Sequence, residues 1–175
     1  MRIAVNTRIL LKDRLEGVGW FTGEVLQRLV RRHPGWEFLF LFDRPHDEAF
    51  VFGPNVRPLT VPPPARHPLL WAWWFNVAVP RVLQQEKADV FLSPDGHCSL
   101  QTAVPTVMVI HDIAHEHFPE QVPWPARRYY EYFIPRYLRR ADRLITVSEF
   151  SKRDIIRHFD LAPETTSVCG KGDRP

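Results

Sequence analysis

Cysteine is scarce in this sequence, and its scarcity excludes a whole class of small disulfide-stabilised proteins. Only two of the 175 residues are cysteines, Cys98 and Cys169, which is too few for a disulfide framework. Long apolar runs are missing as well, because the most apolar stretch, 69–79, has about half the length of a membrane span. Charge of neither sign dominates, with 23 Lys and Arg against 20 Asp and Glu. The composition therefore lacks the strong excess of positive charge that is typical of nucleic-acid-binding proteins. We therefore expect a cytoplasmic protein with two reduced thiols and no nucleic-acid partner.

The sequence does contain the composition of an ordinary globular domain. Hydrophobic residues make up 45% and charged residues 25% of the chain, and 175 residues suffice for one domain with a sizeable core. Short apolar strands alternate with longer helical patterns. Strands are expected at 3–6, 36–42, 56–61, 88–92, 106–110, 143–147 and 165–169, and helices at 17–32, 69–85, 126–140 and 149–159. This order predicts an α/β fold, a Rossmann-like doubly wound sheet of six or seven mostly parallel strands with helices on both faces.

Ligands bind beyond the carboxyl ends of the strands in such sheets, so the residues after each strand are the candidates for a site. Gly17-Val18-Gly19 opens the first helix, where glycine admits a close ligand and free N–H groups attract phosphate. A plain flexible turn explains the same glycines, and Thr22 stands where the dinucleotide-binding pattern needs its third glycine. Asp95 lies in the polar loop after the fourth strand and is a candidate substrate-binding residue, with an ordinary surface turn as the alternative.

A histidine-rich segment, HDIAHEH at 111–117, follows the fifth strand. Its spacing matches neither the H-E-x-x-H helix nor another zinc pattern, so we expect no metal site. A metal-dependent hydrolase that uses His111, His115 and His117 is the less favoured alternative. His111 comes directly after a buried parallel strand and is well placed to hydrogen-bond a ligand. Asp112 follows it as a second substrate-binding candidate, with a structural cap as the alternative.

Two other segments carry hypotheses about partners. Trp71, Trp74 and Phe75 are three and four positions apart and share one helix face. We expect them to pack in the core, and contact with a membrane interface is the alternative. The helix at 126–140 is rich in arginine, which gives either a solvated face or a surface for anionic lipid or polysaccharide. These arginines are Arg127, Arg128, Arg136, Arg139 and Arg140.

These segments together resemble the amino-terminal half of a retaining glycosyltransferase of family 4, which has the GT-B fold. The most specific part is the run RRADRLITVSEFSKRDI at 139–155. The segment VIHDI at 109–113 is similar to the strand-end histidine motif of that family, and Gly17-Val18-Gly19 is similar to its glycine-containing loop. The resemblance extends over essentially the whole chain.

The resemblance implies transfer of a hexosyl group, with retention, from a nucleotide-diphosphate sugar to a glycan or lipid-linked acceptor, without a cofactor. It implies two Rossmann-like domains that face each other across a cleft, with the acceptor on the amino-terminal one. His111 would contact the transferred sugar at the reaction centre. Gly17, Val18 and Gly19 would meet the donor phosphates or the acceptor. Glu16 stands where the family often has another glycine, and it would bring a carboxylate near the anionic diphosphate.

On this resemblance, residues 1–175 form a single acceptor-side domain, and the donor-binding domain is absent from the chain. Family members usually continue V-x-x-N-G-V-D after the last strand, whereas 168–175 read VCGKGDRP. We therefore expect this chain alone to be inactive. A lipid-linked acceptor would suit a protein that is peripheral to a membrane. A non-catalytic module that binds a sugar or a nucleotide is the main alternative function.

Overall fold

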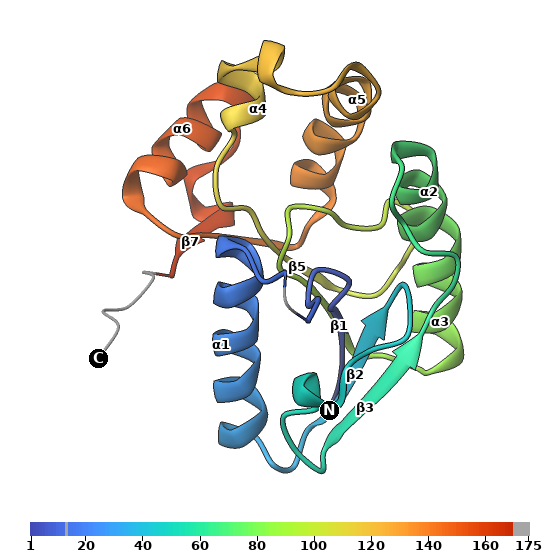
Figure 1. Cartoon of the computed structure of the whole chain (residues 1–175). Coiled ribbons are helices and arrows are strands. Elements are labelled where there is room, and N and C mark those ends of the chain that lie inside the picture. Colours follow the sequence, from blue (N-terminus) through green and yellow to red (C-terminus); the bar gives the residue numbers. More distant parts are fainter. Residues whose placement is uncertain (13, 170–175) are drawn as a thin grey trace.

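A sheet of seven parallel strands runs through the middle of the molecule in the computed structural model, which describes residues 1–12 and 14–169 (Figure 1). The strands lie in the order β3-β2-β1-β4-β5-β6-β7, and every neighbouring pair is parallel. The expected Rossmann-like α/β class is therefore confirmed. The strands are β1 (Arg2–Asn6), β2 (Glu37–Phe42), β3 (Val56–Thr60), β4 (Val90–Ser93), β5 (Thr106–Val109), β6 (Arg143–Thr146) and β7 (Thr166–Val168).

The helices lie close to where the sequence predicts them. One difference concerns the helix expected at 69–85, which contains a π-helical turn, η2 (Trp74–Ala78), between two α-helical parts. Pro80 is the second residue of the second part and follows the π-helical turn without a break, so its missing N–H removes one bond to the preceding turn. The α-helices are α1 (Gly17–Arg32), α2 (Pro68–Trp73), α3 (Val79–Gln85), α4 (Ala114–His117), α5 (Trp124–Arg140) and α6 (Glu149–Phe159), with single 3₁₀ turns η1 (Glu48–Phe50), η3 (Pro119–Gln121) and η4 (Pro163–Thr165).

The central strands bury side chains on both faces, because successive residues of a strand point to opposite sides. On one face, Val5 and Phe40 pack with Leu26 of α1. On the other, Ala4 and Leu41 pack with the helical segment from α2 to α3. A third cluster lies between β5, β6, α5 and α6. Both faces of the sheet are thus covered by helices, as doubly wound folds require.

Several of the large apolar side chains that remain exposed lie near the starts of helices. Trp20 and Phe150 lie in the first turns of α1 and α6, Leu69 is the second residue of α2, and Trp124 is the first residue of α5. Helices that follow parallel strands begin near the edge of the sheet where the strands end, which we term the carboxyl edge. Among the described residues, no helix combines the length and the apolarity that a bilayer crossing requires.

Candidate functional site

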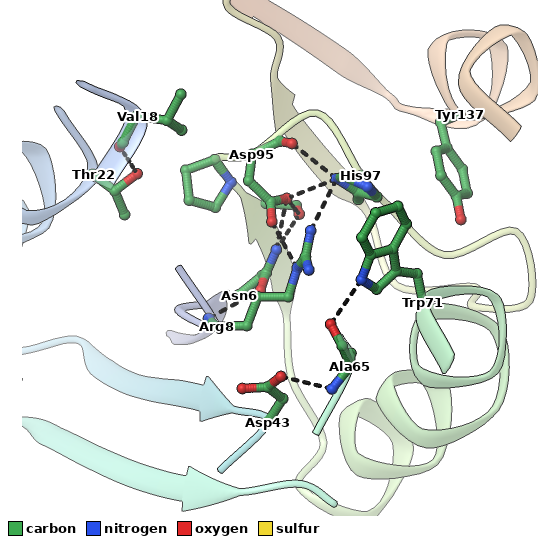
Figure 2. Close-up of polar contacts among 12 residues, drawn as sticks. Asn6, Arg8, Val18, Thr22, Asp43, Ala65, Trp71, Asp95, His97 and Tyr137 are labelled. Carbon is green, nitrogen blue, oxygen red and sulfur yellow. Dashed lines mark hydrogen bonds and ion pairs between the residues drawn. The ribbon is translucent and has the colours of Figure 1, made fainter. Parts of the chain in front are cut away.

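Three neighbouring strands of the sheet, β1, β4 and β5, bring charged and polar side chains together at the carboxyl edge. Arg8 follows β1, Asp95 follows β4, and His111 follows β5. Figure 2 shows Arg8, Asn6 and His97 converging on Asp95. The sequence predicted Asp95 and His111 as site residues, whereas Arg8 and His97 were not identified.

The Asp95 carboxylate is buried and bound by protein groups on both oxygens. Its side chain is only 4% exposed. The Arg8 Nε donates to Oδ2 at 2.9 Å, and the Asn6 amide donates to Oδ1 at 2.8 Å. Burial alone would raise the pKa of Asp95, but the charges of Arg8 and His97 outweigh it and hold that pKa well below its ordinary range. Asp95 is therefore ionised, and its buried charge is balanced by Arg8.

Arg8 is held by aromatic rings as well as by its carboxylate partner. Its guanidinium carbon lies 5.7 Å from the ring centre of Trp71 and 5.4 Å from that of Phe75. These distances are typical of cation–π contacts. The indole nitrogen of Trp71 donates in turn to the Ala65 carbonyl at 2.7 Å (Figure 2). The cation after β1 is thereby connected to the loop that leads into α2.

The turn that contains Asp95 has a fixed shape. Gly96 has a φ of +77°, a conformation that strongly favours glycine, and its N–H donates to the Val109 carbonyl of β5 at 2.9 Å. The His97 ring stacks on Phe75, with ring centres 5.1 Å apart. Its Nδ1 lies 2.9 Å from the Asp95 carbonyl. Because a carbonyl oxygen only accepts, Nδ1 carries the proton.

His111 lies between this turn and the start of α1. Its Nε2 is 3.2 Å from the Pro94 carbonyl, so Nε2 carries a proton and is the donor. The ring of Phe21 packs edge-on against His111, with centres 4.9 Å apart. Phe21 is four residues after Gly17, so the first turn of α1 is adjacent to His111. The structure therefore brings His111 near both the Asp95 turn and the glycine-containing helix start.

The helix start itself offers backbone donors. The first helical hydrogen bond of α1 runs from the Trp20 N–H to the Glu16 carbonyl, so helical bonding does not use the N–H groups of residues 17–19. Glu16 is the N-cap, but its side chain makes no capping hydrogen bond. A Cβ on Gly17 would meet nothing within 4 Å, whereas one on Gly19 would lie 3.0 Å from Leu15 Cδ2. A side chain at position 19 would therefore need a small shift of Leu15, whereas the space at Gly17 is open.

Asp112, His115 and His117 lie in or next to α4, the short helix that follows His111. Asp112 is exposed and accepts at 3.0 Å from the N–H of Ala114, the first residue of α4. His117 Nε2 lies 2.7 Å from an Asp154 oxygen of α6, while burial lowers the pKa of His115. Within the described part of the chain, no three His, Cys, Asp or Glu side chains are arranged to hold a metal ion. The hydrolase hypothesis therefore lacks a metal site there.

A pocket of about 140 Å³ opens beside α4, η3 and the first turns of α5. Tyr130 forms one wall and stacks on Trp71, with ring centres 6.1 Å apart. His115 lines the pocket too, and its buried Nε2 has no hydrogen-bond partner among the described residues. The pocket thus adjoins the aromatic residues that surround Arg8. Its lining consists of His115, Glu116, Pro119, Arg127, Tyr130 and Glu131.

The tryptophan-rich segment is mainly a core element. Trp74 and Phe75 are fully buried and Trp71 is half-buried, so the expected core packing is confirmed. The exposed large apolar side chains of this segment are Leu69, Leu70 and Trp73. The arginine-rich helix α5 presents a mixed surface, since Arg127 and Arg128 both pair with Glu131.

Comparisons with solved structures show the same fold over nearly the whole chain. HepE from Anabaena, solved with UDP and glucose, is 16% identical with a TM-score of 0.54, and the match covers 99% of this chain and 45% of HepE. The UDP-GlcNAc 2-epimerase of Neisseria meningitidis, bound to UDP-GlcNAc, is 13% identical with a TM-score of 0.59, covering 98% of this chain and 47% of that one. MurG of Acinetobacter baumannii is 11% identical with a TM-score of 0.51, covering 99% and 46%.

At such low identities the likeness shows the fold alone, and one of the three proteins is an epimerase. The chain spans less than half of the length of each of these structures. A search of curated proteins gave no match. The family comparison is more specific, because the model of Glycosyltransferase Family 4 matches residues 15–172. Since this match extends over most of the chain, the chain belongs to glycosyltransferase family 4.

Proposed function

We propose that this protein is the acceptor-side domain of a glycosyltransferase that moves a hexosyl group from a nucleotide-diphosphate sugar to a glycan or lipid-linked acceptor. One observation supports this most: His111, the start of α1 and the Arg8–Asp95 pair meet at the carboxyl edge of β1, β4 and β5. That is the edge where doubly wound sheets bind their ligands. Family membership supplies the reaction type, and we propose retention of configuration on the same ground.

His111 and the helix start have separate roles in this proposal. His111 contacts the transferred sugar, while the N–H groups of residues 17–19 and the positive end of the α1 dipole face the leaving diphosphate. Donors fixed in advance stabilise developing negative charge without having to reorient during the reaction. No cofactor is required in this scheme, in which the nucleotide sugar is a substrate.

We assign the acceptor to the pocket beside Tyr130. Its carboxylates Glu116 and Glu131 accept hydrogen bonds, Arg127 donates them, and the Tyr130 ring offers a flat apolar face. A hydroxyl-rich ring needs this mixture of acceptors, donors and an apolar face. The two carboxylates disfavour an anionic group inside the pocket itself.

Contact with a lipid surface is a further part of the proposal, since it would suit a lipid-linked acceptor. Leu69 is 75% and Trp124 is 73% exposed, and their helices α2 and α5 pack side by side. Arg66 lies just before α2 and Arg128 lies on α5, and both side chains are exposed. Exposed positive charge is what binding to anionic headgroups requires. Co-sedimentation with vesicles that contain anionic lipid, compared with neutral vesicles, tests this contact. Equal recovery with both would contradict it.

The proposed role of His111 is tested in the enzyme that includes a donor-binding domain. His111→Ala should lower turnover by about a hundredfold, while the unfolding transition stays close to that of the parent. His117→Ala is the matched control, because His117 lies on the same segment but is paired with Asp154 of α6. Unchanged turnover in a folded His111→Ala variant would refute the assignment.

The non-catalytic alternative is separated by calorimetric titration of the 175-residue chain with several nucleotide sugars. If most donor contacts come from another domain, binding should be about millimolar, worth about 4 kcal/mol. Micromolar binding by this chain without any transfer in the larger enzyme would favour a binding module instead.

A further inference from the structure

We propose that Arg8 and Asp95 are positioning residues that orient the His111 ring through the backbone of the turn at 93–97. The inference rests on the proposed function only in taking His111 as the residue at the reaction centre. Neither Arg8 nor Asp95 needs to touch a substrate in this role. The structural link runs from the Arg8–Asp95 pair to the Pro94 carbonyl and from there to His111 Nε2.

The first step of the link is the fixing of Asp95. Three side chains from two strand ends bind its carboxylate: Arg8 at 2.9 Å, Asn6 at 2.8 Å, and Ser93 with its hydroxyl 3.4 Å away. The Arg8 side chain is 12% and the Asp95 side chain 4% exposed. Removing one partner of an ion pair buried to this degree strongly destabilises the fold, because the other charge stays buried without a partner. The pair therefore determines where the backbone of residues 94–96 lies.

The second step ties this turn to β5 at two points. The Gly96 N–H donates to the Val109 carbonyl at 2.9 Å, and His111 Nε2 donates to the Pro94 carbonyl at 3.2 Å. Val109 and His111 are two positions apart, so the turn and the strand end hold each other in register. A shift of the turn would move the Pro94 carbonyl away from the His111 ring.

The chemical consequence concerns the two nitrogens of His111. The Nε2–H bond to the Pro94 carbonyl fixes which ring nitrogen donates at this point and limits the rotation of the ring. Phe21 packs edge-on against the ring and restricts rotation further. A histidine held in this way presents its ring to a sugar in one defined orientation. Lysine would not replace Arg8 fully, because it lacks the planar fork that binds a carboxylate.

The test measures the His111 ring directly and needs no turnover. In the 175-residue chain labelled with ¹⁵N-histidine, the Nε2–H signal is assigned by its loss in His111→Gln. We expect this proton to exchange slowly with water in the parent chain. In Arg8→Ala and Asp95→Asn its exchange should become about fivefold faster or more, the factor that loss of one hydrogen bond brings. Arg8→Lys should give an intermediate rate.

Arg2→Ala is the matched control, because Arg2 pairs with Glu37 at the opposite end of β1. Its His111 signal should stay within about twofold of the parent, because a surface ion pair away from the turn contributes little to stability. Backbone amide exchange in β5 reports global destabilisation separately.

If Arg8→Ala and Asp95→Asn do not fold, the Arg8→Lys variant decides alone. An Nε2–H exchange rate in this variant equal to that of the parent overturns the proposal. Slow exchange in all folded variants overturns it too, and leaves the proposed function untouched. Loss of turnover in His111→Ala is a separate result.

Discussion

Asp95 illustrates how a buried carboxylate keeps its charge. Its surroundings offer little water, yet Arg8, Asn6 and the nearby His97 stabilise the ionised form more than burial disfavours it. The energetic importance of such a pair lies mainly in the cost of losing one member, because the remaining charge is then buried without a partner. Its contribution to folding is therefore best measured through pH and through removal of a single charge.

We predict that Asp95 makes stability depend on acid. Its folded pKa lies below the unfolded value of about 4, so its contribution is fully present above that value and is lost as the pH falls through the folded pKa. Denaturant unfolding between about pH 5 and pH 3 should show this loss, and Asp95→Asn should flatten it. At neutral pH the same variant should lose about 3 kcal/mol, because Arg8 is left uncompensated. An unchanged pH dependence in the variant would contradict the assigned ion pair.

Glu16 gives a second prediction for a single side chain. It is exposed at the N-cap of α1 and makes no capping hydrogen bond, so Glu16→Gly should change stability little. If the helix start faces a diphosphate, the variant should bind the donor more tightly, because a repulsion of about 1 kcal/mol at 4 Å in water is removed. Donor titration of the enzyme with and without the change measures this. Equal or weaker affinity would show that the loop faces another group.

The roles of these single residues could be predicted only in part. The sequence places His111 and Asp95 at the carboxyl edge because both directly follow predicted parallel strands, and the structure confirms this location while their roles stay predictions. Arg8 satisfied the same rule, two residues after β1, but its partner comes from 87 positions away. Pairing between distant side chains needs the strand order, and sequence pattern does not give that order. This is also why the aromatic contacts of His97 could not be predicted.

Helix boundaries were predicted best where a capping residue or a glycine marks the end of the helix. Ser148 caps α6, with its Oγ accepting from the Ser151 N–H at 3.0 Å, and Gly17 begins α1 as expected. The π-helical turn η2 was missed, because no local signal distinguishes it from continuous helix. It precedes Pro80, which cannot donate a backbone hydrogen bond. Pro58 lies inside β3. β3 is at the edge of the sheet, and an edge strand tolerates a proline because the missing N–H can face away from the neighbouring strand.

We predict that Ser148→Ala costs about 1 kcal/mol, the usual effect of removing an N-cap hydroxyl. The loss arises because the first turn of α6 then has one more N–H without a partner. Denaturant unfolding at neutral pH measures the change. Ser167→Ala is the control, since Ser167 is exposed in β7. A difference of less than about 0.3 kcal/mol between the two variants would contradict the capping role.

For the molecule as a whole, exposed apolar side chains are concentrated at the carboxyl edge, where the candidate site lies. We predict that the 175-residue chain binds a hydrophobic fluorescent dye at this edge. Such dyes bind to clustered apolar surface, and large patches of it are uncommon on a monomer. Replacing Trp124 and Phe150 by serine should lower the dye signal. Gln84→Ser is the control, on an exposed position near the end of α3 at the other edge. Equal dye binding by all three proteins would refute the prediction.

The strand order also has a consequence for synthesis on the ribosome. β1 is made first, yet it lies in the middle of the sheet, and its second neighbour β4 begins only at Val90. A growing chain that has released β1, β2 and β3 still has one side of β1 unpaired, and Ala4, which ends up fully buried under the segment from α2 to α3, is not yet covered. Open strand edges of this kind invite pairing with other chains. The interval in which the ribosome translates the residues between β3 and β4 is therefore the period when this chain most needs a chaperone.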